Sequence, residues 1–157
     1  MTYEMRSGIA LVLVALWLGG AILTAASVAP SAFAVLPTRA LAGDMVGRVL
    51  DVVFISGIVI GAAVALFAGR PPSRLALGAL MALACAHAQF VLGPKIAKAR
   101  ADIDLVVGGD ARRAAFGRLH ALSVASLGVA MLAAALFLTL SLLALRGQRI
   151  PEISSHG

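Results

Sequence analysis

Four long apolar runs dominate the sequence, and they decide in which solvent this chain can fold. They cover about residues 8–29, 52–69, 74–94 and 119–145. A helix that crosses the ~30 Å hydrocarbon core of a bilayer needs roughly 20 apolar residues, and each run is about that long. None of the runs has the strict polar–apolar alternation of a membrane β-strand. We therefore predict an all-α membrane protein, folded as a bundle of four transmembrane helices.

The composition agrees with this prediction. Only 13% of the 157 residues are charged, 61% are hydrophobic and the mean hydropathy is +1.01, whereas soluble domains carry about 25% charged residues. The formal net charge of +6 would suggest nucleic acid as the partner of a soluble protein. Here the basic residues flank apolar runs, where they meet lipid headgroups. We expect the lipid bilayer as a partner, and no nucleic acid.

The first apolar run has some features of a secretory signal. Arg6 precedes it, and the small-residue stretch AFA follows at 32–34. A signal core has only about 7–15 apolar residues, and this run is longer. We therefore predict a first transmembrane helix, and a multi-pass protein of the bacterial cytoplasmic (inner) membrane.

The connections indicate how the runs are arranged within one membrane domain. The second and third runs are joined by the short stretch RPPSR at 70–74, so they must be antiparallel neighbours. The charged connection 95–118 is predicted as an amphipathic helix at the headgroups, and 146–157 as a polar tail. One side of the bundle carries eight basic residues and the other five, which predicts both termini outside the cytoplasm. The eight are Arg39, Arg48, Lys95, Lys98, Arg100, Arg112, Arg113 and Arg118, and the five are Arg6, Arg70, Arg74, Arg146 and Arg149.

Small residues at helical spacing predict where helices touch. Apolar side chains gain little from meeting each other in lipid, so association depends on close packing of backbones and on interhelical hydrogen bonds. The expected packing residues are Gly57 and Gly61 in the second run, Gly78 and Ala82 in the third, and Gly19 and Gly20 in the first.

Polar side chains inside apolar runs are the candidate functional groups. His87 lies about 10 Å of helix rise before Pro94, and His120 lies just inside the fourth run, so both occupy the same half of the membrane. His87 and Gln89 point to roughly opposite sides of their helix, which predicts contacts with different helices. A polar cavity between the first, third and fourth helices would be lined by Ser27, His87, Gln89, His120 and Ser123.

Two histidines on facing helices can ligate haem or a metal, and a single one can hold a chlorophyll-type pigment. His120 and His87 are therefore the candidate cofactor ligands. No acid lies deep in an apolar run, which argues against a proton-coupled pump. For His87 and Gln89 we favour polar packing contacts, whereas for His120 packing and function are equally supported. The sequence predicts no catalytic residues and no dedicated metal site.

Four short motifs resemble a known family. They are LWLGG at 16–20, APSAFAVL at 29–36, AGDMVG at 42–47 and FGRLHALS at 116–123. They resemble the transmembrane-protein-205-like domain of unknown function, and a more distant likeness is to copper-resistance-D-like membrane proteins. Either resemblance implies a four-helix bundle, and the first implies no established activity. By motif match, the recurring positions are Trp17, Gly19, Pro30, Phe33, Gly43, Gly47, Phe116, His120 and Ser123. The chain lacks the histidine arrangement expected of a haem-binding oxidase.

The sequence is compatible with three functions. We favour a non-enzymatic accessory or structural subunit, which packs against other membrane helices of a larger complex, respiratory or photosynthetic, or against itself. The second hypothesis is a small-solute or metal-tolerance protein with a polar site around His120. The third is a haem- or pigment-binding membrane protein.

Overall fold

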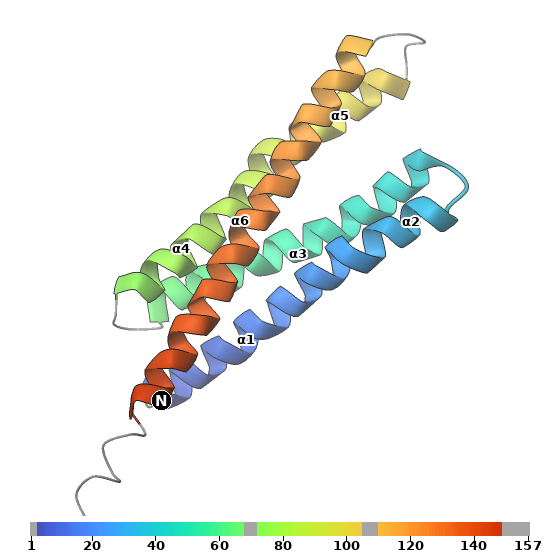
Figure 1. Cartoon of the computed structure of the whole chain (residues 1–157). Coiled ribbons are helices and arrows are strands. Elements are labelled where there is room, and N and C mark those ends of the chain that lie inside the picture. The colour runs from blue at the N-terminus through green and yellow to red at the C-terminus, as the bar shows by residue number, and fades with distance from the viewer. Residues whose placement is uncertain (1–2, 68–71, 105–109, 149–157) are drawn as a thin grey trace, which may run out of the picture.

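The apolar runs form four long helices that pack as one bundle (Figure 1). The computed structural model describes the backbone of residues 3–67, 72–104 and 110–148, and the side chains of residues 5–67, 72–100 and 113–146. Four helices in these ranges are long and apolar enough to span a membrane, namely Met5–Val35, Arg39–Phe67, Pro72–Arg100 and Arg113–Arg146. The described residues include no strand. The predicted all-α membrane fold is confirmed, and the chain is a multi-pass membrane protein in contact with the bilayer.

The first span is a helix in three parts, α1 (Tyr3–Leu23), the π-helical segment η1 (Thr24–Val28) and α2 (Ala29–Val35). It ends because Pro37 forces the residue before it, Leu36, into an extended conformation with φ −77° and ψ 142°. The next helix, α3 (Arg39–Phe67), begins after Thr38. The Thr38 hydroxyl accepts a hydrogen bond from the Leu41 N–H at 3.2 Å, as a capping residue does.

The third span also has three parts, α4 (Pro72–Ala86), the π-helical segment η2 (His87–Leu92) and α5 (Gly93–Asp104). Pro72 is the first residue of α4, where its missing N–H costs nothing. The last helix, α6 (Asp110–Gln148), has 39 residues. At about 58 Å it is much longer than the ~30 Å hydrocarbon core, so it must project beyond it.

Two differences from the predicted runs matter for the site. α3 begins at Arg39 rather than near residue 52, which places Asp44 and Asp51 inside a helix. Residues 68–69 of the predicted second run, 105–109 of the charged connection and 149–157 of the predicted tail lie outside the described residues. The exact membrane boundaries along these helices stay a prediction.

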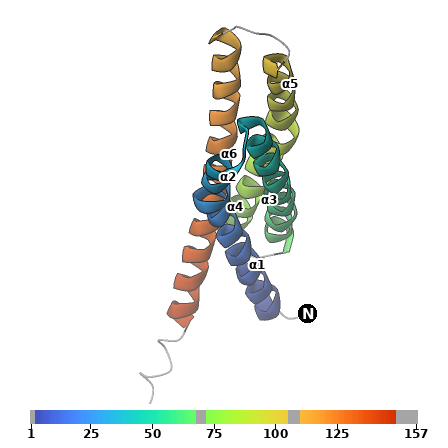
Figure 2. The same cartoon turned by 90° about the vertical axis from the view of Figure 1, so that its right-hand side faces the viewer.

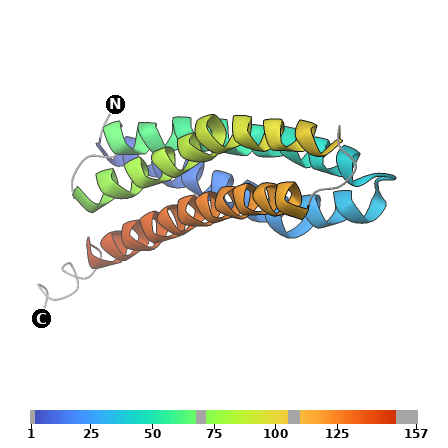
Figure 3. The same ribbon diagram turned by 90° about the horizontal axis from the view of Figure 1, so that it is seen from above.

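The helices are arranged so that α4 packs between α3 and α6, while α1 contacts both α3 and α6. α1 begins and α6 ends at the same end of the bundle (Figure 1). At the other end the bundle divides into two arms, one formed by α2 with the start of α3 and one by α5 with the start of α6 (Figures 1 and 2). Seen from above, the four helices run nearly side by side (Figure 3).

Small residues occupy the contacts between the helices. A Cβ on Gly61 would lie 2.7 Å from the Ala82 nitrogen, and a Cβ on Gly78 would lie 2.8 Å from the Gly61 carbonyl oxygen. The backbones of α3 and α4 are therefore in direct contact. Ala21 and Ala130 are fully buried, whereas Leu16 and Leu132 face outward. This distribution is expected in lipid, where close backbone approach stabilises helix pairs more than large apolar side chains do.

Candidate functional site

Both π-helical segments end two residues before a proline, and the proline explains them. Pro30 and Pro94 have no N–H, so neither can donate to the carbonyl four residues earlier. The residue before each proline bonds five residues back instead. The Ala29 N–H donates to the Thr24 carbonyl, and the Gly93 N–H donates to the Ala88 carbonyl. Such segments widen the helix locally and are frequent at functional sites.

The segment η2 carries two of the predicted polar residues, and they contact different helices. His87 Nδ1 lies 3.2 Å from Ser126 Oγ on α6. The Gln89 amide donates to Asp51 Oδ1 on α3 at 3.1 Å. The predicted divergence of the two side chains is therefore present. Together they connect the third span to both of the helices beside it.

A second group of polar contacts lies towards the end of the two arms, centred on Arg100 of α5. Its guanidinium forms an ion pair with Asp44 of α3 and lies 6.0 Å from the centre of the Phe116 ring on α6. Phe116 in turn stacks on His120, with ring centres 6.1 Å apart. Arg100 thus contacts both arms. We call Asp44, Arg100, Phe116 and His120 the Arg100 cluster.

Gly43 of α3 makes room for the guanidinium of Arg100, which extends from α5. A Cβ at this position would lie 2.9 Å from an Arg100 guanidinium nitrogen, so glycine lets the guanidinium rest against the helix. The side chains of Arg100 and Asp44 keep 32% and 62% of their surface exposed. An ion pair this exposed contributes about 0–1 kcal/mol, and the cluster therefore orients the arms more than it stabilises them.

The remaining predicted site residues do not gather around one space. Ser123 is buried in α6, and Ser27 is exposed on η1. His120 is exposed and stacked on Phe116. Ser126, the partner of His87, lies six residues after His120, which is about 9 Å along α6 and well round its circumference. His87 contacts Ser126 and His120 stacks on Phe116, so the two imidazole rings do not face each other. This arrangement disfavours a single haem or metal ion held between the two histidines.

No three His, Cys, Asp or Glu side chains of the described residues gather as metal ligands would. Cys85 is buried, and it lies against Gly57, where a Cβ would be 2.6 Å from its sulfur. The Trp17 indole lies against the same side of Gly57, where a Cβ would be 2.9 Å from its nitrogen, and it donates a buried hydrogen bond to the Val53 carbonyl at 2.8 Å. Cys85 and Trp17 are thus packing residues of the bundle centre.

Arg100, Asp44 and Asp51 are site residues that the sequence did not predict. Asp44 and Asp51 are seven residues apart, and residues with this spacing share one face of a helix. The sequence would therefore have indicated a common acidic face if α3 had been predicted to begin at Arg39. No comparable signal exists for Arg100. Its contacts depend on how α5 is rotated after η2, which the local sequence does not reveal.

Comparison with known proteins places the chain in a family. The profile of the domain of unknown function DUF4149 matches residues 12–104, from within α1 to the end of α5. No curated protein and no solved structure matches the chain. The match agrees with the prediction of an uncharacterised domain, and it supports neither the transmembrane-protein-205-like nor the copper-resistance-D-like resemblance. Since more than half of the chain is covered, this protein belongs to the DUF4149 family.

Proposed function

We propose that this protein is a non-enzymatic accessory subunit of the bacterial cytoplasmic membrane, which packs against the helices of another membrane protein. The observation that carries the proposal is a strip of small residues on the outer face of α1. Gly8, Ala15 and Gly19 are exposed on one face, with Gly20 beside them. A Cβ at Gly8, Gly19 or Gly20 would meet nothing within 4 Å.

The outward glycines of α1 bring no other described helix of the chain into close contact, because a Cβ on them would meet nothing within 4 Å. Each costs about 0.8–1.0 kcal/mol of helix propensity relative to alanine. The inward glycines Gly57, Gly61 and Gly78 offset that cost because they let helices of this chain touch. On α1 the corresponding gain requires a helix from elsewhere, since small residues are enriched where membrane helices associate.

The polar contacts of the bundle support the same proposal. His87, Gln89 and Arg100 each contact a side chain on a neighbouring helix of the same chain. Such contacts fix the relative rotation of helices and present a defined outer surface to a partner. A solute site around His120, or a haem between the histidines, would need these side chains to face a shared space.

The test is gentle detergent extraction from native membranes, followed by sizing and identification of what copurifies. We expect a particle containing this chain and at least one other membrane protein. Gly19→Ile should remove most of the partner, because its side chain holds the partner's backbone away. Gly128→Ile is the matched control, since Gly128 also has open space around it but lies on α6.

Thermal unfolding of both purified variants should match that of the wild type, because a Cβ at either position meets nothing within 4 Å. A particle with only this chain would contradict the accessory role. Full retention of the partner by Gly19→Ile would show that the α1 strip is not the contact surface.

A further inference from the structure

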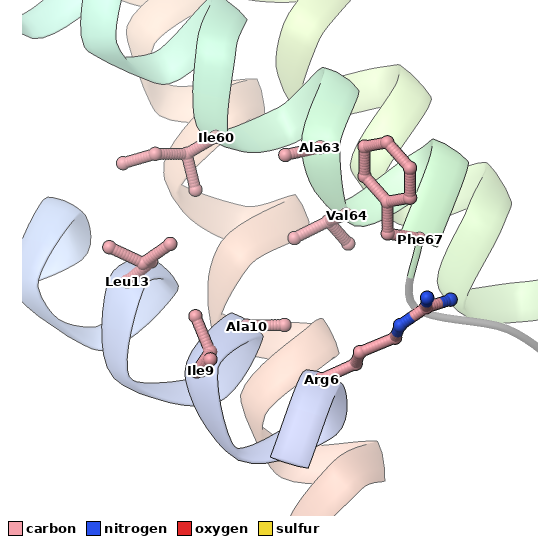
Figure 4. A pocket seen from close by; sticks show the side chains of 8 residues that line it. All are labelled: Arg6, Ile9, Ala10, Leu13, Ile60, Ala63, Val64 and Phe67. Atoms are coloured by element: carbon pink, nitrogen blue, oxygen red, sulfur yellow. The ribbon is translucent and has the colours of Figure 1, made fainter. Parts of the chain in front are cut away.

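A pocket of about 300 Å³ opens between α1 and α3 at the end of the bundle where α1 begins (Figure 4). It lies at the opposite end of the bundle from the Arg100 cluster, with η2 between them in the middle of the third span, and none of the candidate functional residues predicted from the sequence line it. Seven of its eight lining residues are apolar. The lining is formed by Arg6, Ile9, Ala10 and Leu13 of α1 and by Ile60, Ala63, Val64 and Phe67 of α3.

The pocket exists because two short side chains face each other where the helices are apart. α1 and α3 are joined nearer the bundle centre, where Trp17 bonds the Val53 carbonyl. Towards the helix ends, Ala10 and Ala63 face the pocket (Figure 4) and are too small to fill the space between the backbones. The larger side chains of Ile9, Leu13 and Ile60 form its walls.

Arg6 is the charged residue among the described residues that line the pocket. Its side chain extends from the first turns of α1 at one end of the pocket (Figure 4), and it is exposed. From Arg6 to Leu13 the lining extends about 10 Å along the helix. A cation therefore stands at one end of an apolar pocket, near the end of a helix long enough to span the membrane, and basic residues at such ends meet lipid headgroups.

We propose that this pocket binds one anionic phospholipid of the surrounding bilayer. The phosphate pairs with the Arg6 guanidinium, and one acyl chain lies between Ala10 and Ala63 towards Leu13. Guanidinium groups bind phosphate oxygens through paired charge-assisted hydrogen bonds. A volume of about 300 Å³ is at the lower limit for small-molecule sites and suits a single chain rather than a helix, which needs a long open groove. The proposal does not rest on the accessory role.

The only tryptophan of the chain provides the readout. Trp17 is buried and lies one helical turn beyond Leu13, about 6 Å along the axis. Purified full-length protein is reconstituted into phosphatidylcholine bilayers. These contain either dibrominated phosphatidylglycerol or dibrominated phosphatidylcholine at equal mole fraction. A brominated chain in the pocket quenches Trp17, so we expect phosphatidylglycerol to quench at lower mole fraction.

Substitutions at Arg6 test the headgroup contact. Arg6→Gln should weaken the apparent affinity for phosphatidylglycerol about fivefold, the size expected for one basic residue at a membrane surface. Arg6→Lys should retain most of that affinity. Arg146→Gln is the matched control, because it removes the same charge at the same end of the bundle from outside the pocket, and it should have no effect.

Ala63→Phe tests the chain contact by filling the pocket, and should reduce quenching by phosphatidylglycerol to the level of phosphatidylcholine. Its helix content and unfolding temperature are measured alongside. If this variant does not fold, the Arg6 series decides alone. Equal quenching of the wild type by both lipids, an Arg6→Gln variant with unchanged affinity, or undiminished quenching of folded Ala63→Phe would each overturn the proposal.

Discussion

Gly61 and Gly78 let the backbones of α3 and α4 touch, and this contact sets the distance between the two helices. Added Cβ atoms would come within 2.8 Å of main-chain atoms at both positions. A main-chain neighbour cannot move aside as the end of a long side chain can. The helices must separate instead, which opens the packing around the buried Met81 and Cys85.

At this scale we predict that Gly61→Val destabilises the bundle by about 2 kcal/mol or more, in the upper part of the range for overpacked sites. The measurement is reversible unfolding in mixed micelles. Gly128→Val is the control and should change stability by less than about 1 kcal/mol, because a Cβ there meets nothing within 4 Å. Equal effects of the two substitutions would show that the α3–α4 contact does not limit stability.

Each of the first and third spans is one long helix divided by a π-helical segment shortly before a proline. The shared cause is the missing N–H of Pro30 and Pro94, which moves the preceding hydrogen bond from four residues back to five. In η2 this wider turn carries His87 and Gln89 to α6 and α3. η2 therefore lacks regular α-helical hydrogen bonding, and its side chains form two contacts between spans.

We predict that Pro94→Ala stabilises the isolated protein by about 1–3 kcal/mol, because the new N–H can donate to the Phe90 carbonyl, a hydrogen bond that proline cannot form. The backbone amide that this substitution introduces should exchange slowly with deuterium, and unfolding should shift accordingly. Pro72→Ala is the control and should have little effect, since Pro72 begins α4. A loss of stability in Pro94→Ala would mean that the η2 side-chain contacts contribute more to stability than the added backbone hydrogen bond.

The helices were predictable from the sequence, whereas most contacts between them were not. A run of roughly 20 apolar residues is a sufficient signal for a span. The sequence indicates less clearly which face of a span is buried, because lipid and the protein interior are both apolar and select similar side chains. Leu16 and Leu132 are exposed while Ala21 and Ala130 are buried, the reverse of a soluble core. The Arg100–Asp44 pair joins segments 56 residues apart, and it depends on the turn of η2.

The whole molecule has two unlike ends. The end with the two arms carries the Arg100 cluster and most of the basic residues of the connections. The other end carries the start of α1, the end of α6 and the pocket with Arg6. Basic residues are retained on the cytoplasmic side during insertion, so this asymmetry has a direct topological consequence.

We predict that the arms lie in the cytoplasm and that both termini lie outside it. Alkaline phosphatase fused to the C-terminus should be active in bacterial cells, and a green fluorescent protein fused at the same place should stay dark. Arg39→Gln with Arg48→Gln, which removes two of the eight basic residues, should produce a mixed population. The opposite reporter pattern in the wild type would reverse the assignment of the two ends.

The two π-helical segments have one more consequence. A hydrogen bond that closes five residues back encloses one residue more than the usual α-helical bond, so each of these segments holds one surplus residue. A one-residue deletion within Thr24–Val28 or His87–Leu92 would therefore be absorbed without turning α2 or α5 out of alignment. The same deletion in the middle of α3 would rotate everything beyond it by about 100°. We therefore expect insertions and deletions among family members to concentrate in these two segments, because a change of length there leaves the packing of the helices unchanged.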